Sequence, residues 1–322
     1  MKPKLKIIYI WIIISVIVQS SILLYIDQFY LNRENESTFS KSIDVTDADT
    51  IIKVDTDAQS IKLSFDATYL SYVSNKKLVI IEVKSRLTVK TIDVGVNKIN
   101  CYEWLPDRNT IIYSVQLDEA ARISTYDVAH RAEKSYPEIS IDSKETFQVA
   151  DIDLSPLTNV VYVKINVGNI SRIYKYNIRE DLKFIMLTDP STTIEETIYT
   201  DNLIYQDNSG KIFVRDDSQS ITTELKSKEK LVLLGLNAKD MLFAGKLDSQ
   251  GSVSEVIYGK PQDTNIDKSW SKIPLNQPMP ADDIFIRSNG SIYQKDKDVL
   301  YINDNFVVTK DGKSVKIKTL DR

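Results

Sequence analysis

The sequence predicts an all-β domain built from a repeated unit and preceded by a single membrane-spanning helix. Three observations lead to this expectation: a strand-prone composition, a segment that matches itself fifty residues later, and an uncharged run near the N-terminus. Seventeen tyrosines and only nine glycines accompany abundant Ile, Val and Thr. These residue types fit a pleated, half-buried surface, and a chain of 322 residues can bury a substantial core.

Residues 7–26 contain no charge and follow Lys2, Lys4 and Lys6. About twenty apolar residues at 1.5 Å each span a hydrocarbon core of roughly 30 Å. The run is longer than the apolar centre of a cleaved signal peptide and has no A-x-A-like site, so an uncleaved anchor is favoured over a cleaved signal. The positive-inside rule places the basic flank at 1–6 in the cytoplasm. We therefore predict a single-pass protein of the cell membrane, in contact with the lipid bilayer through 7–26, with its C-terminal domain outside.

Residues 27–47 are polar and predict a spacer between the membrane and the domain. From 48 to 322, short runs of Ile, Val, Tyr, Phe and Leu alternate with Asp, Asn, Ser, Gly and Lys. The segment 118–134 has a helix-like composition, but its counterpart at 169–183 is strand-like, so we expect a hairpin in both places.

The segment 102–128, which begins YEWLPDRNTIIYSV, matches the chain fifty residues further on. Pro106 falls on Pro156 and Ile123 falls on Ile173. One apolar position recurs along the whole domain, and we call it the marker: Tyr72, Tyr113, Val163, Tyr205, Phe243 and Phe285. Successive markers are 41, 50, 42, 38 and 42 residues apart.

A period of about 40–45 residues with several strands per unit is the signature of a β-propeller. We predict six blades, with seven as the alternative; a two-sheet sandwich would not produce the self-match. The strand that carries the marker is expected to be the innermost strand of its blade. The ring should be closed by 49–57 lying beside 314–320, because an open ring leaves strand edges free to pair with other chains.

Two motifs carry a resemblance to a known repeat. Trp104-Leu105-Pro106-Asp107-Arg108 precedes Ile123-Ser124-Thr125-Tyr126-Asp127, and Ser155-Pro156 precedes Ile173-Tyr174-Lys175-Tyr176-Asn177. The pattern resembles the propeller repeat of TolB-like proteins and of the N-terminal propeller of prolyl oligopeptidase and dipeptidyl-peptidase relatives. The resemblance covers about 48–322 but is close in only three of the units. The glycine that the known repeat has in its turn is replaced by Arg108 or absent. The resemblance implies a propeller. The sequence contains no G-x-S-x-G motif, which would mark the hydrolase domain of those relatives.

No catalytic, cofactor or metal site is expected from the sequence. The only histidine, His130, lies in a predicted turn, and Cys101 is interpreted as a small buried hydrophobe. The acidic stretches 44–49, 55–58 and 206–211 lack the spacing of a calcium loop that ends in Glu. Asp and Asn dominate ordinary turns, so the turn interpretation is favoured for all three stretches.

The net charge of the chain beyond the N-terminal lysines limits the kinds of partner that are expected. Without the three N-terminal lysines, 38 basic residues stand against 45 acidic ones, a net charge of −7. A surface of that sign repels nucleic acid, and no stripe of Lys and Arg offsets it, so no nucleic-acid partner is expected. The Lys-, Ile- and Asn-rich composition suggests a bacterial protein.

The sequence thus predicts a membrane-anchored, extracytoplasmic, non-catalytic binding or scaffold module for a protein, peptide or cell-wall component. The alternative is a carboxylate-dependent hydrolase or lyase acting on glycans or peptides, which convergent carboxylates at the mouth of the propeller would favour. Asp107 and Arg108 are the candidate partner-binding residues at the rim. The neighbouring Trp104 is interpreted as packing between blades.

Overall fold

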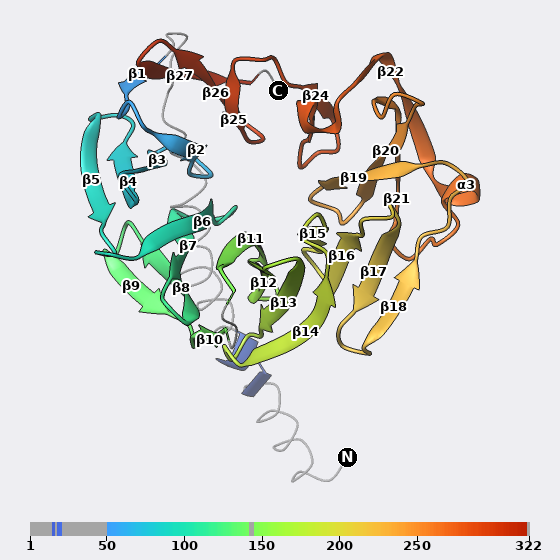
Figure 1. The fold of residues 1–322 in the computed structure, drawn as a ribbon, viewed down its shortest axis with the longest axis horizontal. Helices are drawn as coiled ribbons and strands as arrows, with labels where there is room; N and C mark the ends of the chain where they lie inside the picture. The colour runs from blue at the N-terminus through green and yellow to red at the C-terminus, as the bar shows by residue number, and fades with distance from the viewer. Residues whose placement is uncertain (1–14, 17, 21–49, 142–144, 321–322) are drawn as a thin grey trace, which may run out of the picture. The chain divides into compact units, whose positions relative to one another are not determined.

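The structure is a computed structural model that describes residues 15–16, 18–20, 50–141 and 145–320. The chain divides into two units, Met1–Thr46 and Asp47–Arg322. In the second unit the described residues form antiparallel sheets set around a common axis (Figure 1). Six of these sheets have four or more strands, so the described part of the unit is an all-β propeller with six full blades, as predicted.

Each of the first five blades is formed by strands that follow one another along the chain. Blade 1 holds β2 (Gln59–Leu63), β3 (Tyr69–Ser74), β4 (Lys77–Glu82) and β5 (Leu87–Ile92). Blade 2 holds β6 (Lys98–Trp104), β7 (Thr110–Gln116), β8 (Ala120–Asp127), β9 (Ala132–Ser135) and β10 (Ile139–Ser140). Blade 3 holds β11 (Phe147–Ser155), β12 (Val160–Val167), β13 (Ile170–Tyr176) and β14 (Leu182–Thr188).

Blade 4 holds β15 (Thr193–Glu196), β16 (Asn202–Gln206), β17 (Ile212–Asp216) and β18 (Ile221–Glu224). Blade 5 holds β19 (Leu231–Leu236), β20 (Leu242–Leu247), β21 (Val253–Gly259) and β22 (Ser271–Met279), with the short helix α3 (Ile266–Ser269) before its last strand.

The sixth full blade closes the ring, and we call it the closing blade. It holds β25 (Val299–Ile302), β26 (Phe306–Asp311), β27 (Ser314–Thr319) and, from the other end of the domain, β1 (Thr50–Lys53). Thr50 pairs with Ile317 and Lys53 pairs with Ser314, in antiparallel register. This pairing confirms the predicted clasp between 49–57 and 314–320.

A two-stranded sheet lies between blade 5 and the closing blade in the chain, and we call it the half-blade. It consists of β23 (Ile284–Ile286) and β24 (Ile292–Gln294) after the short turn η2 (Ala281–Asp283). The chain passes from β24 directly to β25, so the outer two strands of this unit are missing from the described sheet. The unit that carries the last marker, Phe285, is therefore an incomplete blade in addition to the six full ones.

The fifty-residue self-match has a direct structural counterpart. In blade 2, Ile111 pairs with Tyr126, and in blade 3, Val161 pairs with Tyr176. Each residue of the second pair lies fifty positions after its equivalent in the first, so the two central hairpins have the same register. The hairpins expected at 118–134 and 169–183 are both present, as β8–β9 and β13–β14.

The expected position of the marker strands is wrong. The first five markers lie on β3, β7, β12, β16 and β20, each the second strand of its sheet, and Phe285 lies on β23. The innermost strands are β2, β6, β11, β15 and β19, which precede the recurring turn and contact one another in sequence order around the axis (Figure 1). Second strands are covered on both faces by neighbouring blades, so the strongest apolar signal comes from the middle of a blade rather than from the axis.

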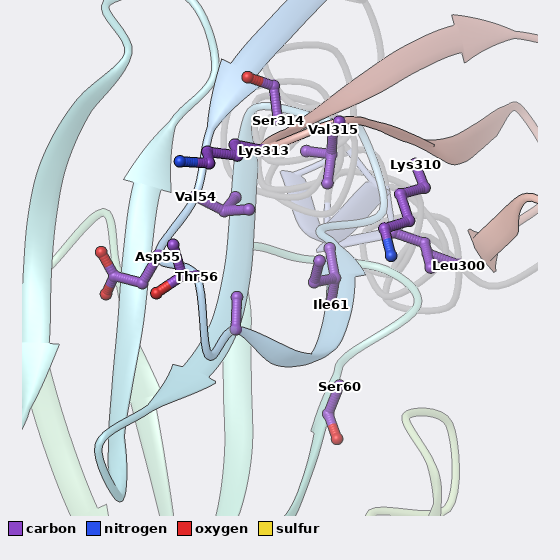
Figure 2. Close-up of a pocket in the computed structure, with 12 residues that line it drawn as sticks. Val54, Asp55, Thr56, Ser60, Ile61, Leu300, Lys310, Lys313, Ser314 and Val315 are labelled. Carbon is purple, nitrogen blue, oxygen red and sulfur yellow. The ribbon is translucent and has the colours of Figure 1, made fainter.

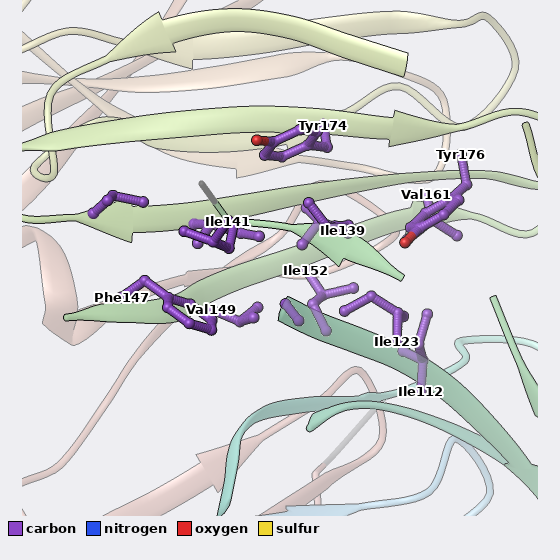
Figure 3. Close-up of a cluster of buried hydrophobic side chains, with 14 residues drawn as sticks. Ile112, Ile123, Ile139, Ile141, Phe147, Val149, Ile152, Val161, Tyr174 and Tyr176 are labelled. Carbon is purple, nitrogen blue, oxygen red and sulfur yellow. The ribbon is translucent and has the colours of Figure 1, made fainter. Parts of the chain in front are cut away.

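Apolar walls between adjacent blades form the core. The wall between blades 2 and 3 brings Ile112 and Ile123 of one blade against Ile152, Val161 and Tyr176 of the next (Figure 3). Ile123 and Tyr176 are fully buried. Similar clusters join blades 1 and 2, blades 3 and 4, blades 4 and 5, and blade 5 and the half-blade. Each blade therefore buries its faces only against its neighbours, which is why the ring must close.

The predicted membrane span at 7–26 lies mostly outside the described residues. Within it, residues 15–16 and 18–20 are described, and they are helical. Among the described residues there is no helix long and apolar enough to cross a bilayer. The predicted flank at 1–6 and spacer at 27–47 lie entirely outside the described residues.

Candidate functional site

Four carboxylates gather where the innermost strands of blades 2, 3 and 4 approach their turns, and we call them the axial carboxylate cluster. They are Glu103 on β6, Asp151 and Asp153 on β11, and Glu195 on β15. They line one pocket of about 330 Å³. The rest of its lining is mostly apolar: Trp104, Pro106, Ile152, Leu154, Thr193 and Ile194. We call this end of the ring the axial mouth.

Strand alternation places these side chains. On β11, Ile152 is fully buried in the wall between blades, whereas Asp151 and Asp153 on either side of it line the pocket. On β6, Glu103 lies between the buried side chains of Tyr102 and Trp104. On β6 and β11 one face therefore builds the core while the other presents acidic groups to the pocket.

The repeat itself contains a signal for this cluster that the sequence analysis missed. Glu103, Asp153 and Glu195 each stand ten residues before the marker of their unit, and Lys62 holds the same position in blade 1. Reading along the chain for catalytic motifs could not find them, since they are 50 and 42 residues apart. Comparing equivalent positions of successive units would have found a polar layer at the axis.

Burial and mutual repulsion raise the pKa values of the cluster. Loss of solvation, followed by the charge of Asp151, raises the pKa of Asp153 to about 7. Burial raises the pKa of Glu195 well above its usual value, and the charges of Asp153 and Asp151 add to the effect. Burial also raises the pKa of Glu103 and of Asp151. The cluster therefore holds protons that isolated carboxylates would release at neutral pH.

Two lysines offset part of this charge. Lys62 on β2 forms an ion pair with Glu103 and lowers its pKa against the effect of burial. Lys164 on β12 acts on Asp151 in the same sense, but its amine donates hydrogen bonds to the carbonyls of Pro190, at 2.7 Å, and Thr192. Lys62 and Lys164 therefore offset the charges of Glu103 and Asp151, while burial keeps protons on Asp153 and Glu195.

Glu196 lies beneath the turns beside the mouth and is 5% exposed. Thr158 Oγ1 donates a 3.2 Å hydrogen bond to Glu196 Oε1, and the Glu196 backbone N–H donates to Asp153. Glu196 Oε2 is buried and has no hydrogen-bond partner among the described residues. Burial, with the charge of Asp153, raises the pKa of Glu196 to about 10, so this carboxyl is protonated at neutral pH.

The turns between the innermost and second strands form a rim. Acidic side chains in these turns accept hydrogen bonds from the neighbouring blade. Asn109 of blade 2 donates a 3.1 Å hydrogen bond to Asp66 of blade 1. Asp240 of blade 5 accepts hydrogen bonds from the backbone N–H groups of Ile198, at 2.6 Å, and Tyr199, at 3.0 Å. These acidic turn residues are therefore structural links between neighbouring blades.

Asp107 and Arg108, the residues predicted at the rim, form an ion pair with each other instead. Arg108 Nε and Nη2 donate to the two carboxylate oxygens of Asp107 at 3.0 and 2.8 Å. Their side chains are 44% and 48% exposed. They lie in the same turn as Pro106, which lines the axial pocket, so the structure places them beside the mouth.

Trp104 packs between blades, as predicted. Its side chain is 7% exposed, and its indole Nε1 donates a 2.8 Å hydrogen bond to Ser71 Oγ of blade 1. The indole also stacks on Tyr69 with ring centroids 6.1 Å apart. Trp104 therefore fastens blade 2 to blade 1.

His130 and Cys101 do not belong to the mouth. The His130 side chain is 79% exposed, and its Nδ1 lies 2.9 Å from Asp127 of the same turn. Cys101 on β6 packs against the wall between blades 2 and 3, and burial raises the pKa of its thiol to about 12. A thiol with that pKa stays protonated at neutral pH and is a poor nucleophile.

The acidic stretches at 55–58 and 206–211 build turns. Asp57 accepts hydrogen bonds from Ser74 Oγ, at 2.7 Å, and from the Asn75 N–H, at 2.9 Å. Asp207 accepts two backbone N–H bonds within its own turn. The stretch at 44–49 lies outside the described residues, and within them no three His, Cys, Asp or Glu side chains gather in a way that could hold a metal ion.

Other pockets lie away from the mouth. One of about 340 Å³ lies at the seam between the closing blade and blade 1, and Figure 2 shows Val54, Ile61 and Val315 in it together with Lys310 and Lys313. Asp55 also lines this pocket, so its charge is mixed.

Comparison with solved structures identifies the fold. No protein-family model and no curated protein sequence matches this chain. Hsv2 of Kluyvelomyces marxianus matches with a TM-score of 0.50 and 15% identity, over 79% of this chain and 88% of that one. The WD40 domain of SCAP from fission yeast matches with a TM-score of 0.50 and 12% identity, over 74% of this chain and 56% of that one. At these identities the two likenesses show a β-propeller fold alone.

A TolB structure from Acinetobacter baumannii also matches. Its TM-score is 0.47 with 14% identity, and the match covers 82% of this chain and 63% of that one.

Proposed function

We propose that this protein is a membrane-anchored, non-catalytic binding module that captures a protein, peptide or cell-wall component outside the cell membrane. The observation that carries the proposal is the axial pocket of about 330 Å³, where strands and turns of three blades meet. Binding sites are typically concave, mostly apolar and equipped with a few convergent polar groups, and this pocket has all three properties.

The anchor is proposed at residues 7–26 with the N-terminus in the cytoplasm. The uncharged run and the lysines that precede it support this topology. We expect the mature protein to keep 7–26 and protease added to intact cells to digest the domain. Protection of the domain would reverse the orientation, and a mature N-terminus near residue 22 would mean a secreted protein.

The carboxylate cluster supports one alternative, a hydrolase or lyase that acts on glycans or peptides at the mouth. An acid–base mechanism needs one carboxyl that keeps its proton at neutral pH and another that has lost it. Asp153, with a pKa of about 7, and Glu103, paired with Lys62, are the residues that would take these roles.

A capture experiment on the full chain separates the two functions. The tagged protein and its Glu195→Gln variant are cross-linked on intact cells, purified from the membrane and compared with an Ile221→Ser variant on the outer strand of blade 4. We expect one partner to be recovered intact with the wild type and the Ile221→Ser protein, and to be depleted with Glu195→Gln.

Recovery of a cleaved partner, with cleavage lost in Asp153→Asn, would support the hydrolase instead. A partner held equally by the wild type and the Glu195→Gln variant would place binding elsewhere on the molecule and contradict the proposed site.

A further inference from the structure

The pocket at the seam between the closing blade and blade 1 has no part in the axial mouth, and we call it the seam pocket. Its volume of about 340 Å³ is within the range of sites that hold small molecules. Val54, Ile61 and Val315 form its apolar wall (Figure 2). Leu300 also lines it and is 44% exposed, so the apolar lining reaches the molecular surface.

The seam pocket lies at the end of the ring opposite the axial mouth. Its two lysines belong to the hairpin of β26 and β27, the second and third strands of the closing blade. Turns at the mouth join first and second strands, and successive turns of an antiparallel sheet lie at opposite ends. Gly312 has a φ of +58°, which suits a two-residue hairpin turn. This tight turn fixes the backbone of Lys313 at the edge of the pocket.

The two lysines of the seam pocket lack a counter-charge. Among the described residues, neither Lys310 nor Lys313 has a hydrogen-bond acceptor or an ion-pair partner for its amine. Asp55 is the one acidic residue in the described lining. Burial raises the pKa of Tyr72 in blade 1, and the charge and side-chain hydrogen bond of Asp55 add to the effect. Asp55 is therefore directed to Tyr72, and in Figure 2 its carboxylate points away from Lys310.

The charge around the seam pocket is opposite to that of the chain as a whole. Residues 306–320 hold four lysines and one acidic residue, whereas the whole chain has a net charge of −4. Lys310 and Lys313 are the two of these lysines that line the pocket. A lysine amine is a compact positive charge that binds carboxylate and phosphate oxygens. The pocket therefore combines an apolar wall with positive charge in an otherwise acidic protein.

We propose that the seam pocket binds a small organic anion. A carboxylate or phosphate group of the ligand meets Lys310 and Lys313, and a body of a few apolar carbons lies against Val54, Ile61 and Val315. An inorganic ion would leave the apolar wall uncovered, and a neutral molecule would leave both amines unpaired. The ligand contacts β2 of blade 1 and β27 of the closing blade together, so it bridges the seam at which the ring closes. The site is separate from the axial mouth and does not rest on the proposed binding function.

Calorimetric titration of the full chain in phosphatidylcholine nanodiscs tests the proposal, with empty nanodiscs as the blank. The probes are hexanoate, hexyl phosphate, 1-hexanol, acetate and inorganic phosphate. We expect hexanoate or hexyl phosphate to bind at least tenfold more tightly than 1-hexanol, and the tighter of the two identifies the anionic group. The same ligand should bind at least tenfold more tightly than acetate or inorganic phosphate, since each buried methylene strengthens binding by up to about fourfold. At saturation it should also raise the melting temperature, because it binds the folded state.

Variants separate the charged and apolar contributions. Lys310→Gln combined with Lys313→Gln should weaken the ligand at least tenfold and leave the melting of the free protein unchanged, because exposed charges contribute little to stability. Leu300→Ser should reduce the advantage of hexanoate over acetate several-fold. The matched control, Lys84→Gln combined with Lys318→Gln, removes two exposed lysines that do not line the pocket and should bind as the wild type does.

Three results would overturn the inference. They are equal affinity for hexanoate and 1-hexanol, wild-type affinity in the double variant of Lys310 and Lys313, and inorganic phosphate that binds as tightly as hexyl phosphate, which would mean an adventitious ion only. Binding of acetyl-Leu-Val through its free carboxylate, without binding of hexanoate or hexyl phosphate, would assign the pocket to the end of a peptide and likewise reject the small ligand. The capture experiment on cells reports on the axial mouth alone, so failure of either test leaves the other inference standing.

Discussion

The walls between blades and the axial mouth follow opposite rules, although the same strands build both. On β11, Ile152 is fully buried against blade 2, and the Asp151 and Asp153 side chains on either side of it face the axis. The wall gains stability from every apolar side chain that it buries. The mouth brings like charges together in a partly buried site, which opposes folding. The comparison shows that one face of β11 maintains the ring while the other lines the pocket at the mouth.

The largest effect should come from opening the ring. Deleting 49–57 removes β1 and leaves β27 without its partner strand. We expect the domain to lose more than about 4 kcal/mol, because removal of a fully buried side chain such as Ile52 alone costs about 2–5 kcal/mol. Calorimetric melting of the full chain measures this, with deletion of 33–41 in the predicted spacer as the control of equal length. Unchanged melting after deletion of 49–57 would show that the ring does not depend on the clasp.

The next largest effect should come from a single wall residue. Ile123→Ala leaves a cavity between blades 2 and 3, and we expect the free energy of unfolding to fall by about 2–5 kcal/mol. Ile123→Val, which removes one methylene, should cost about 0.5–1.5 kcal/mol. Chemical denaturation measures both values. If the two variants were equally stable, the wall would be loosely packed and the contrast with the mouth would fail.

Neutralising the mouth should stabilise the domain. Asp153→Asn combined with Glu195→Gln removes charge repulsion, and we expect a gain of about 1 kcal/mol, or roughly 2–4 °C in melting temperature. A loss of stability would show that the hydrogen bonds that Asp153 accepts from the Leu154 and Glu196 N–H groups outweigh the repulsion.

The same carboxylates give stability a pH dependence. A carboxyl with a raised pKa binds its proton more tightly in the folded than in the unfolded state, so protonation favours folding. Its contribution is most favourable below the unfolded pKa of about 4 and declines as the pH rises through the folded-state value. We therefore expect the advantage of the double variant over the wild type to grow between pH 4 and pH 8. Melting both proteins across that range isolates the effect of these two carboxyls together with that of neighbours such as Glu196, whose pKa the charge of Asp153 raises.

The smallest effect on stability should come from the rim. Asp107→Ala combined with Arg108→Ala removes an exposed ion pair, which contributes about 0–1 kcal/mol. We expect nearly unchanged melting and weaker capture of the partner on cells. A double variant that melts much earlier would make these residues structural links like Asp66 and Asp240.

The ring of blades could be predicted from the sequence, whereas the carboxylates at the axial mouth could not, and the reason is physical. Repeat spacing and turn composition are local properties, so they predicted the blades, the two hairpins at 118–134 and 169–183, and the clasp of β1 with β27. Their apolar signal, however, is strongest in strands covered on both faces. That bias led to the wrong assignment of the marker strands as innermost.

The carboxylate cluster escaped prediction because it exists only after the ring has formed. Glu103, Asp153 and Glu195 come from three blades and meet through tertiary packing, and no short motif connects them. The three residues hold equivalent positions in their repeat units, but this layer of polar residues becomes apparent only when the units are aligned with one another. Glu196 could not be predicted at all, since its missing partner is a property of the folded turns around it.

The clasp has a mechanical consequence. Strand β1 is the first described element after the predicted anchor, and it pairs with β27 from the other end of the domain. Any tension that the chain transmits ahead of Thr50 therefore reaches the β1–β27 hydrogen bonds of the closing blade before it reaches any other blade. A load along the tether would be borne first at the closure of the ring, with the hydrogen-bonded edge of β27 exposed as soon as β1 is pulled away.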